Sequence, residues 1–401
     1  MRRIVLHRQV AGRTILLIAF SLLALYPLSA QNDSLPEEPR RFFFKGYLKD
    51  LQTATFTPEE GSLLTGNFLH NRLNFRGQPT SALTFRLEVR TRLFWGEDVK
   101  VTPGFAEQVD YENGWMDLSW IVVDDSAVVL HTIADRLLLN WRRGPWDVTV
   151  GRQRINWGMS TAWNPNDLFN AYNFFDFDYE ERPGSDAIRL RYRLKNGMSG
   201  LEAAFSRQQA DSTAIAALLY RFNHRGYDVQ ALAGLYRQDV ALGLGWAGSI
   251  GDAGFRGEAT YFQPTASFWD TVGVLSFTVG ADYSFAGGWY AGASFLYGSA
   301  GVDDALPPNR FYNQELSAKL LMPYRYNFLT QTSRQWTPLF YTQLNLVYSP
   351  GADAFLVFPV LTYSVANNWD ADLVVQSFFA PLDGHFKNRG NALIFRLRWG
   401  F

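Results

Sequence analysis

Apolar and arginine side chains alternate along many short segments of this chain, and this pattern constrains the fold more than any other feature. In the closing stretch 391–401, Leu393, Phe395 and Leu397 share one parity, while Arg396 and Arg398 share the other. Successive side chains of a β-strand point to opposite faces, so this strand would have one apolar and one charged face. Taken alone, it fits a soluble β protein about as well as a membrane barrel.

Three arginines on one face of a single segment favour the membrane barrel. Arg189, Arg191 and Arg193 alternate with apolar residues in 186–195, and the stretch 81–95 repeats the pattern with Arg86 and Arg90. An arginine facing lipid near mid-membrane costs about 2–4 kcal/mol, so these side chains must face a wet lumen. Segment 146–156 breaks the rule after Val150, and we expect a bulge near Gly151 or emergence from the membrane there.

Composition supports the same class of protein. Aromatic residues make up 16% of the 401 residues, which suits the aromatic girdles of a membrane barrel. Beyond the N-terminus there is no apolar run of roughly 18 residues, which excludes a helical membrane protein. A net charge of −1 argues against nucleic acid, and the absence of Cys excludes a disulfide scaffold and a thiolate metal site.

The N-terminus predicts export from the cytoplasm. Arginines precede a short apolar stretch at 15–25, and Ala30 ends a small-residue cleavage site. We expect a signal peptide at 1–30, a periplasmic lead-in at 31–40 and a single transmembrane barrel domain at 41–401. A retained N-terminal anchor is the alternative for the first segment.

Turn chemistry and loop length predict a closed antiparallel barrel of eighteen strands, with sixteen as the alternative. Gly, Asn and Pro mark tight turns at one end, while the longest connections, 96–130, 157–185, 299–311 and 380–390, gather at the other. Two connections fit badly, because 324–335 is too long and 238–239 too tight. The expected strands are 41–55, 66–77, 81–95, 131–142, 146–156, 186–195, 199–208, 214–222, 227–237, 240–250, 253–263, 274–285, 288–298, 312–323, 336–348, 353–365, 369–379 and 391–401.

The inward arginines form a candidate basic wall along the pore. Fixed positive charge beside a narrow aqueous path attracts anions. The alternative is an internal network of ion pairs with Glu88, Asp135, Glu202 and acids of the loops. The wall residues are Arg72, Arg76, Arg86, Arg90, Arg92, Arg136, Arg142, Arg189, Arg191, Arg193, Arg396 and Arg398.

The segment 151–193 carries the least common motif of the chain, G-R-Q…W-G…N-P-N-D followed by P-G-S-D-A-I-R. It resembles porin-like bacterial outer-membrane barrels that include the alginate-export type, and this resemblance implies a diffusion or export channel. We interpret 157–185 as a loop that narrows the pore, with a structural plug as the alternative. Its candidate residues are Trp157, Asn164, Asp167, Asp176, Asp178 and Arg182.

The aromatic end of the chain, Trp399 and Phe401, resembles the signal that the barrel-assembly machinery reads on outer-membrane proteins. This places the chain in the outer membrane of a Gram-negative-type bacterium, with membrane lipid, the assembly machinery and small solutes as partners. The oligomeric state stays open.

No enzyme, cofactor or metal site is expected. The histidines after the predicted signal, His70, His131, His224 and His385, stand in no nucleophile motif, and no His/Asp/Glu cluster has ligand spacing. The function we infer is passive passage of small anionic or polar solutes. The alternatives are a closed barrel that partners an envelope complex, and a barrel that binds a surface ligand through loop 96–130 with Trp115 and Trp120.

Overall fold

The structure is a computed structural model, which describes residues 41–59, 61–110, 114–171, 184–194, 199–208, 213–266, 268–307 and 316–401. The predicted signal peptide and lead-in lie outside the described residues, as do Asp176, Asp178 and Arg182. Within the described ranges, no helix has the length and hydropathy that a membrane crossing requires.

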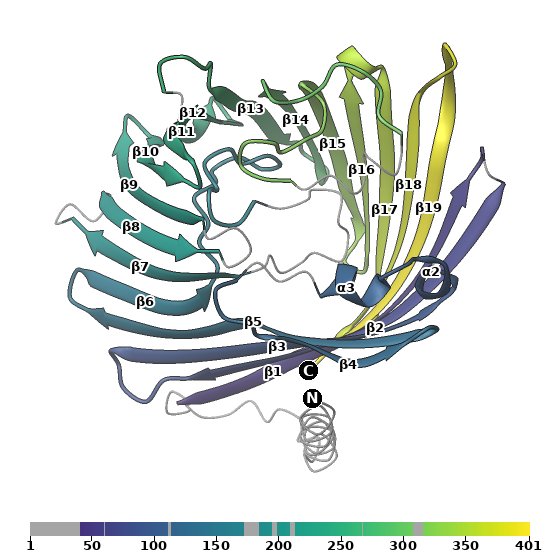
Figure 1. Ribbon diagram of the computed structural model, residues 1–401, viewed down its shortest axis with the longest axis horizontal. Coiled ribbons are helices and arrows are strands. Elements are labelled where there is room, and N and C mark those ends of the chain that lie inside the picture. Colours follow the sequence, from purple (N-terminus) through teal and green to yellow (C-terminus); the bar gives the residue numbers. More distant parts are fainter. Residues whose placement is uncertain are drawn as a thin grey trace.

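The described strands form one antiparallel sheet that curls into a ring (Figure 1). Two short helices, α2 (Glu97–Val101) and α3 (Phe105–Val109), and the 3-10 turn η1 (Pro350–Ala352) interrupt it. The strands are β1 (Phe42–Thr57), β2 (Ser62–Gly77), β3 (Leu83–Gly96), β4 (Ser119–Asp125), β5 (Val128–Arg143), β6 (Trp146–Gln153), β7 (Ser185–Arg193), β8 (Gly200–Arg207), β9 (Ala214–His224), β10 (Tyr227–Tyr236), β11 (Asp239–Ile250), β12 (Ala253–Pro264), β13 (Val274–Ser284), β14 (Trp289–Gly298), β15 (Tyr326–Thr337), β16 (Phe340–Ser349), β17 (Ala354–Ala366), β18 (Trp369–Leu382) and β19 (His385–Gly400).

The ring closes between its first and last strands. Tyr47 pairs with Gly400 at one end of the β1–β19 ladder, and Phe56 pairs with Asn391 at the other. The Gly46 N–H donates to the Phe401 carbonyl over 2.8 Å, and the Phe401 N–H donates back over 2.9 Å. Of the 19 strands described, β4 pairs with β5 alone and only extends the wall, which leaves 18 in the closed ring. The predicted eighteen-strand barrel is confirmed.

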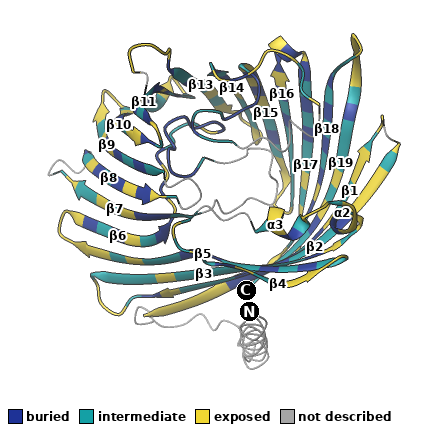
Figure 2. Cartoon of the chain, in the orientation of Figure 1, coloured by how far each residue is buried: buried dark blue, intermediate teal, exposed yellow. Residues whose placement is uncertain are grey.

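Buried and exposed residues alternate along many strands of the wall (Figure 2). Leu218, Leu242 and Leu244 point outward and expose 64%, 54% and 61% of their surface, whereas their neighbours Leu219 and Ala241 are buried inside. A continuous apolar exterior is stable only in a membrane. The chain is therefore an outer-membrane β-barrel, and its longest connections, after β3, β6 and β14, lie at one end of it.

The structure corrects the prediction between β14 and β16. The expected strand 312–323 is wrong: residues 316–323 form turns and an isolated bridge, and 308–315 lie outside the described residues. The strand that follows β14 is β15, Tyr326–Thr337, and all but its last two residues lie in the stretch 324–335 that the sequence assigns to a connection. The stretch 324–335 is too long for a turn because it contains most of this strand.

Two further expectations about connections change. The predicted long loop 380–390 is a tight turn at Asp383 and Gly384, because β18 and β19 continue into it. The stretch 96–130 contains α2, α3 and the unexpected β4. The connection at 238 is tight, as its sequence suggested, with Arg237 in the left-handed region at φ 56°.

Candidate functional site

An inner loop, defined as residues 154–171, leaves the end of β6 and lies inside the ring (Figures 1 and 2). Its apolar side chains are buried in two clusters. Ile155, Trp157 and Leu168 pack with inward residues of β7–β12, while Trp163 packs with inward residues of β14–β18. The inner loop therefore reaches two separate parts of the wall, as a segment that narrows a barrel must.

Glu258 of β12 holds the inner loop to the wall. Its fully buried carboxylate accepts three main-chain N–H groups, from Met159, from Ser160 over 2.7 Å and from Asn166 over 3.0 Å. The Thr260 hydroxyl donates to the Asn166 side-chain oxygen over 2.7 Å. Buried N–H groups need acceptors, so this carboxylate fixes the path of the loop. Sequence reasoning did not identify Glu258, because it shares its face of β12 with Arg256 two residues earlier and so does not stand out as an isolated charge.

Trp157 joins the inner loop to the arginine wall. Its indole N–H donates to Glu202 Oε1 over 2.5 Å, and the same oxygen accepts from Arg189 Nε over 2.6 Å. The Gln230 amide donates to the Trp157 carbonyl over 2.6 Å. Trp157 is thus a structural anchor with no exposed surface.

The other described loop candidates are also buried. Asp167 accepts the Trp157 N–H over 3.4 Å, and Asn164 accepts the Asp167 N–H through its main-chain carbonyl over 3.1 Å. Asp167 exposes 1% of its surface and Asn164 exposes 4%. Both residues shape the inner loop from within and do not present charge to a solute.

A second inner segment, residues 316–325, packs against the first. Leu321, Met322 and Tyr324 are buried together with Trp163 and with wall residues such as Phe378. Ala318 joins the other cluster beside Trp157. This segment was predicted as part of a strand, and its apolar residues are buried against the loop and wall.

One group of wall arginines is neutralised by acids. Arg72 of β2 and Arg90 of β3 are register partners. Both form ion pairs with the Asp135 carboxylate, and the distance from Arg90 is 2.9 Å. Arg72 also binds Glu88 over 2.7 Å. Asp135 is the extra residue of a bulge in β5 opposite Glu88 and Val89, and the Arg136 guanidinium donates to its carbonyl over 2.7 Å.

A second neutralised group lies nearer the periplasmic turns. Asp147 of β6 binds Arg142 over 3.0 Å and Arg191 over 2.7 Å. Arg193 lies at the turn itself, where it donates to the Gly144 carbonyl over 3.3 Å.

A third group of arginines lacks acid partners. Arg76 and Arg86 face each other across β2 and β3, Arg154 follows β6, and none of the three forms an ion pair with a described residue. All three are exposed and line a cavity of about 220 Å³. Arg136, Arg142, Arg189 and Arg191 line the same cavity, so seven guanidinium groups surround it.

Gly151 explains how β6 departs from simple alternation. Its φ of 109° is a backbone conformation that glycine adopts readily and other residues rarely adopt. A Cβ at this position would lie 2.2 Å from the Leu137 carbonyl oxygen. Beyond it Arg152 is buried and binds Asp186 over 2.8 Å, although its parity matches that of the exposed Val150. The bulge expected near Gly151 is absent: Gly151 has a positive φ, but the pairing of β6 with β5 and with β7 continues through it without a shift in register.

Arg92 lies apart from the unpaired arginines, in a wider cavity of about 510 Å³ with His131. Arg92 donates to His131 Nδ1 over 3.2 Å, so the neutral imidazole carries its proton on Nε2. His131 Nε2 lies 2.7 Å from the Ser119 hydroxyl and 3.1 Å from Asp110. A protonated Nε2 cannot accept the serine proton, so the three residues do not form a hydrolytic triad.

The remaining candidates lie at the seam. Arg396 binds Asp372 over 2.8 Å, and the Arg398 guanidinium lies 5.2 Å from the Tyr47 ring centroid. Trp399 stacks on Trp369 with centroids 5.9 Å apart, and its ring lies 5.1 Å from that of Phe401. In the described residues, no group of three His, Cys, Asp or Glu could hold a metal ion.

No protein-family model matches the sequence, and no curated protein matches it. Solved structures do match the fold. Acinetobacter baumannii OccAB4 aligns with a TM-score of 0.58 and 9% identity over 90% of this chain and 99% of its own. Pseudomonas aeruginosa OccK8 (OprE) aligns with a TM-score of 0.57 and 10% identity, over 90% of this chain and 98% of its own. Pseudomonas aeruginosa OpdQ aligns with a TM-score of 0.57 and 7% identity, over 90% of this chain and 99% of its own. The chain therefore has the barrel fold seen in the Occ outer-membrane proteins.

Proposed function

We propose that this barrel is a passive channel for small anionic or polar solutes, narrowed by the inner loop. The observation that carries the proposal is the cavity surrounded by Arg76, Arg86 and Arg154, which have no acid partner among the described residues. Unpaired positive charge in a confined aqueous space raises the local concentration of anions. The fold shared with the Occ proteins, which are outer-membrane channels, supports solute passage.

Paired and unpaired arginines have separate parts in this proposal. Arg72, Arg90, Arg142 and Arg191 hold the wall together through Asp135 and Asp147. Arg76 and Arg86 keep their guanidinium groups available for a carboxylate or phosphate, which they could bind in a two-pronged geometry. The preference of the channel for anions would then depend on Arg76 and Arg86.

Planar bilayer recordings test the proposal. The purified barrel is expected to conduct, and its reversal potential in a salt gradient is expected to favour anions. In the double variant Arg76→Gln/Arg86→Gln, the reversal potential should move toward that of an unselective pore. Arg225→Gln, at an exposed turn between β9 and β10, is the matched control and should leave it unchanged.

Absence of conductance in every salt would overturn the proposal and favour a closed barrel. An unaltered reversal potential in the double variant would show that these arginines do not set selectivity. The motif in 151–193 also resembles barrels of the alginate-export type. If the channel shares their substrate class, uronate oligomers should enter the pore and block the current.

A further inference from the structure

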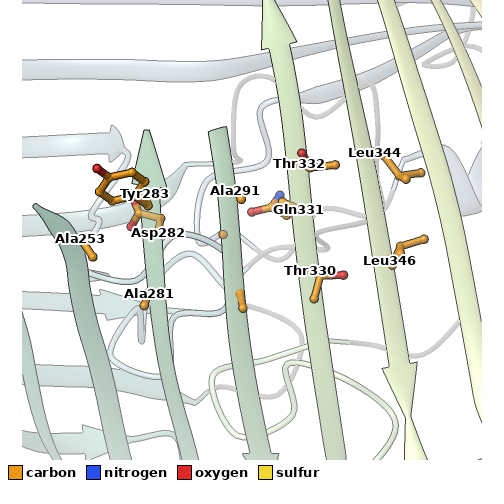
Figure 3. A pocket seen from close by; sticks show the side chains of 12 residues that line it. Ala253, Ala281, Asp282, Tyr283, Ala291, Thr330, Gln331, Thr332, Leu344 and Leu346 are labelled. Atoms are coloured by element: carbon orange, nitrogen blue, oxygen red, sulfur yellow. The ribbon is translucent and has the colours of Figure 1, made fainter. Parts of the chain in front are cut away.

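The outer surface of the barrel carries a groove across β13–β16, shown with its side chains in Figure 3. It has a volume of about 430 Å³. Small residues form its floor, where large apolar side chains cover most of the outer wall. The register places the pairs Ala281–Ala293, Ala291–Thr332 and Ala293–Thr330 directly opposite one another.

Strand parity shows that this groove faces lipid. Leu296, Leu329 and Val347 lie at odd offsets from the groove residues on β14, β15 and β16, and they are buried with Trp163 of the inner loop. The groove residues must therefore point away from the lumen. Further along the same outer face, Phe328 exposes 47% of its surface.

A cation lies beyond the periplasmic end of the groove. Arg334 follows Thr332 by two residues on the outer face of β15, which corresponds to roughly 7 Å along the strand. Its guanidinium carbon lies 4.1 Å from the ring centroid of Trp336 and 5.1 Å from that of Trp289. Its Nε is buried without a hydrogen-bond partner, and no ion pair joins Arg334 to a described residue.

We infer that this surface is a binding site for one phospholipid of the periplasmic leaflet. The phosphate would accept hydrogen bonds from Arg334, whose planar fork suits phosphate oxygens. An acyl chain would lie in the groove over Ala291, Ala293 and Thr330. The two tryptophans hold the guanidinium at the level of the membrane interface, where the headgroup lies.

Charge complementarity selects this occupant over a second copy of the barrel. The groove offers almost no polar surface, while the cation beyond its end has no acid among the described residues to neutralise it. An amphipathic molecule with an anionic head and a hydrocarbon tail matches both features at once. A second barrel would have to supply a carboxylate opposite Arg334 at the membrane interface.

Native mass spectrometry of the intact barrel with added phosphatidylglycerol tests the inference. One lipid should remain bound to the wild-type protein. Arg334→Gln should weaken retention about tenfold, the change expected for a hydrogen bond to a charged group. Ala291→Leu/Ala293→Leu should fill the groove and abolish retention. Arg225→Gln and Ala233→Leu, on a distant part of the wall, are matched controls and should bind as wild type.

Circular dichroism before each measurement establishes that the variants are folded barrels. Equal retention by wild type, Arg334→Gln and the groove-filled double variant would overturn the inference. A dimer that the groove-filled variant separates would also overturn it, because the surface would then be a subunit contact.

Discussion

Glu258→Ala should release the inner loop from the barrel wall. The wild-type carboxylate is the acceptor for the N–H groups of Met159, Ser160 and Asn166, and it lies on β12 without solvent exposure. Alanine removes both acceptor oxygens and leaves the three N–H donors without this partner. The loop then retains its two tryptophan anchors and loses the polar contact between them.

The magnitude follows from the number of bonds. Each hydrogen bond to a charged group contributes about 1.5–3 kcal/mol, so three lost bonds amount to roughly 4.5–9 kcal/mol of loop docking. Removing a buried carboxylate recovers part of its desolvation cost, which leaves a net loss of about 3 kcal/mol. Glu258→Gln should have a smaller effect, because one amide oxygen can still accept from Met159 and Ser160 while its NH₂ opposes the Asn166 N–H.

Single-channel recording and limited proteolysis are the assays. The alanine variant should show frequent current fluctuations and a higher mean conductance, and protease should cut between residues 154 and 171. Asp252→Asn, at an exposed periplasmic turn, is the matched carboxylate control. A steady wild-type current together with a protected loop in Glu258→Ala would refute the reasoning, since the carboxylate would then not hold the loop.

Two further predictions concern stability. Trp157→Phe keeps an aromatic ring in place but loses the 2.5 Å hydrogen bond to Glu202, and we expect about 2 kcal/mol lower unfolding free energy in urea; an unchanged midpoint would contradict this. Gly46→Val should weaken the barrel seam, because a Cβ there would meet the Phe401 ring at 2.7 Å, and the folded form should lose its resistance to heating in SDS. Gly400→Val is the control, since nothing lies within 4 Å of a Cβ at that position; equal losses in both variants would rule out the proposed clash.

The sequence predicts the barrel well where the wall separates lipid from water. Arg189 and Arg191 alternate with exposed Ile188 and Leu190 in β7, as expected. The prediction fails at β15, where Thr330 and Thr332 face lipid and Leu329 faces the buried inner loop. Apolar residues inside and hydroxyl groups outside weaken the contrast on which strand recognition depends.

The same physical reason limits what can be predicted about the site. The alternation shows which arginines share a face. It cannot distinguish Arg72, bound to Asp135, from Arg76, which has no acid partner in the part of the chain that the structure describes. That difference depends on a bulge and on contacts across several strands. The role of Glu258 could not be predicted from the sequence, because its hydrogen-bond donors are main-chain N–H groups, which every residue except proline carries.

Apolar and charged side chains are distributed asymmetrically around the barrel interior. Hydrocarbon fills the side next to β14–β18, whereas guanidinium groups line the side formed by β2, β3 and β5–β7. Any water column through the proposed channel must then run off the central axis, along the charged side. A bulky thiol reagent should stop the current when attached to a cysteine introduced at Thr84 and leave it intact when attached at Thr362.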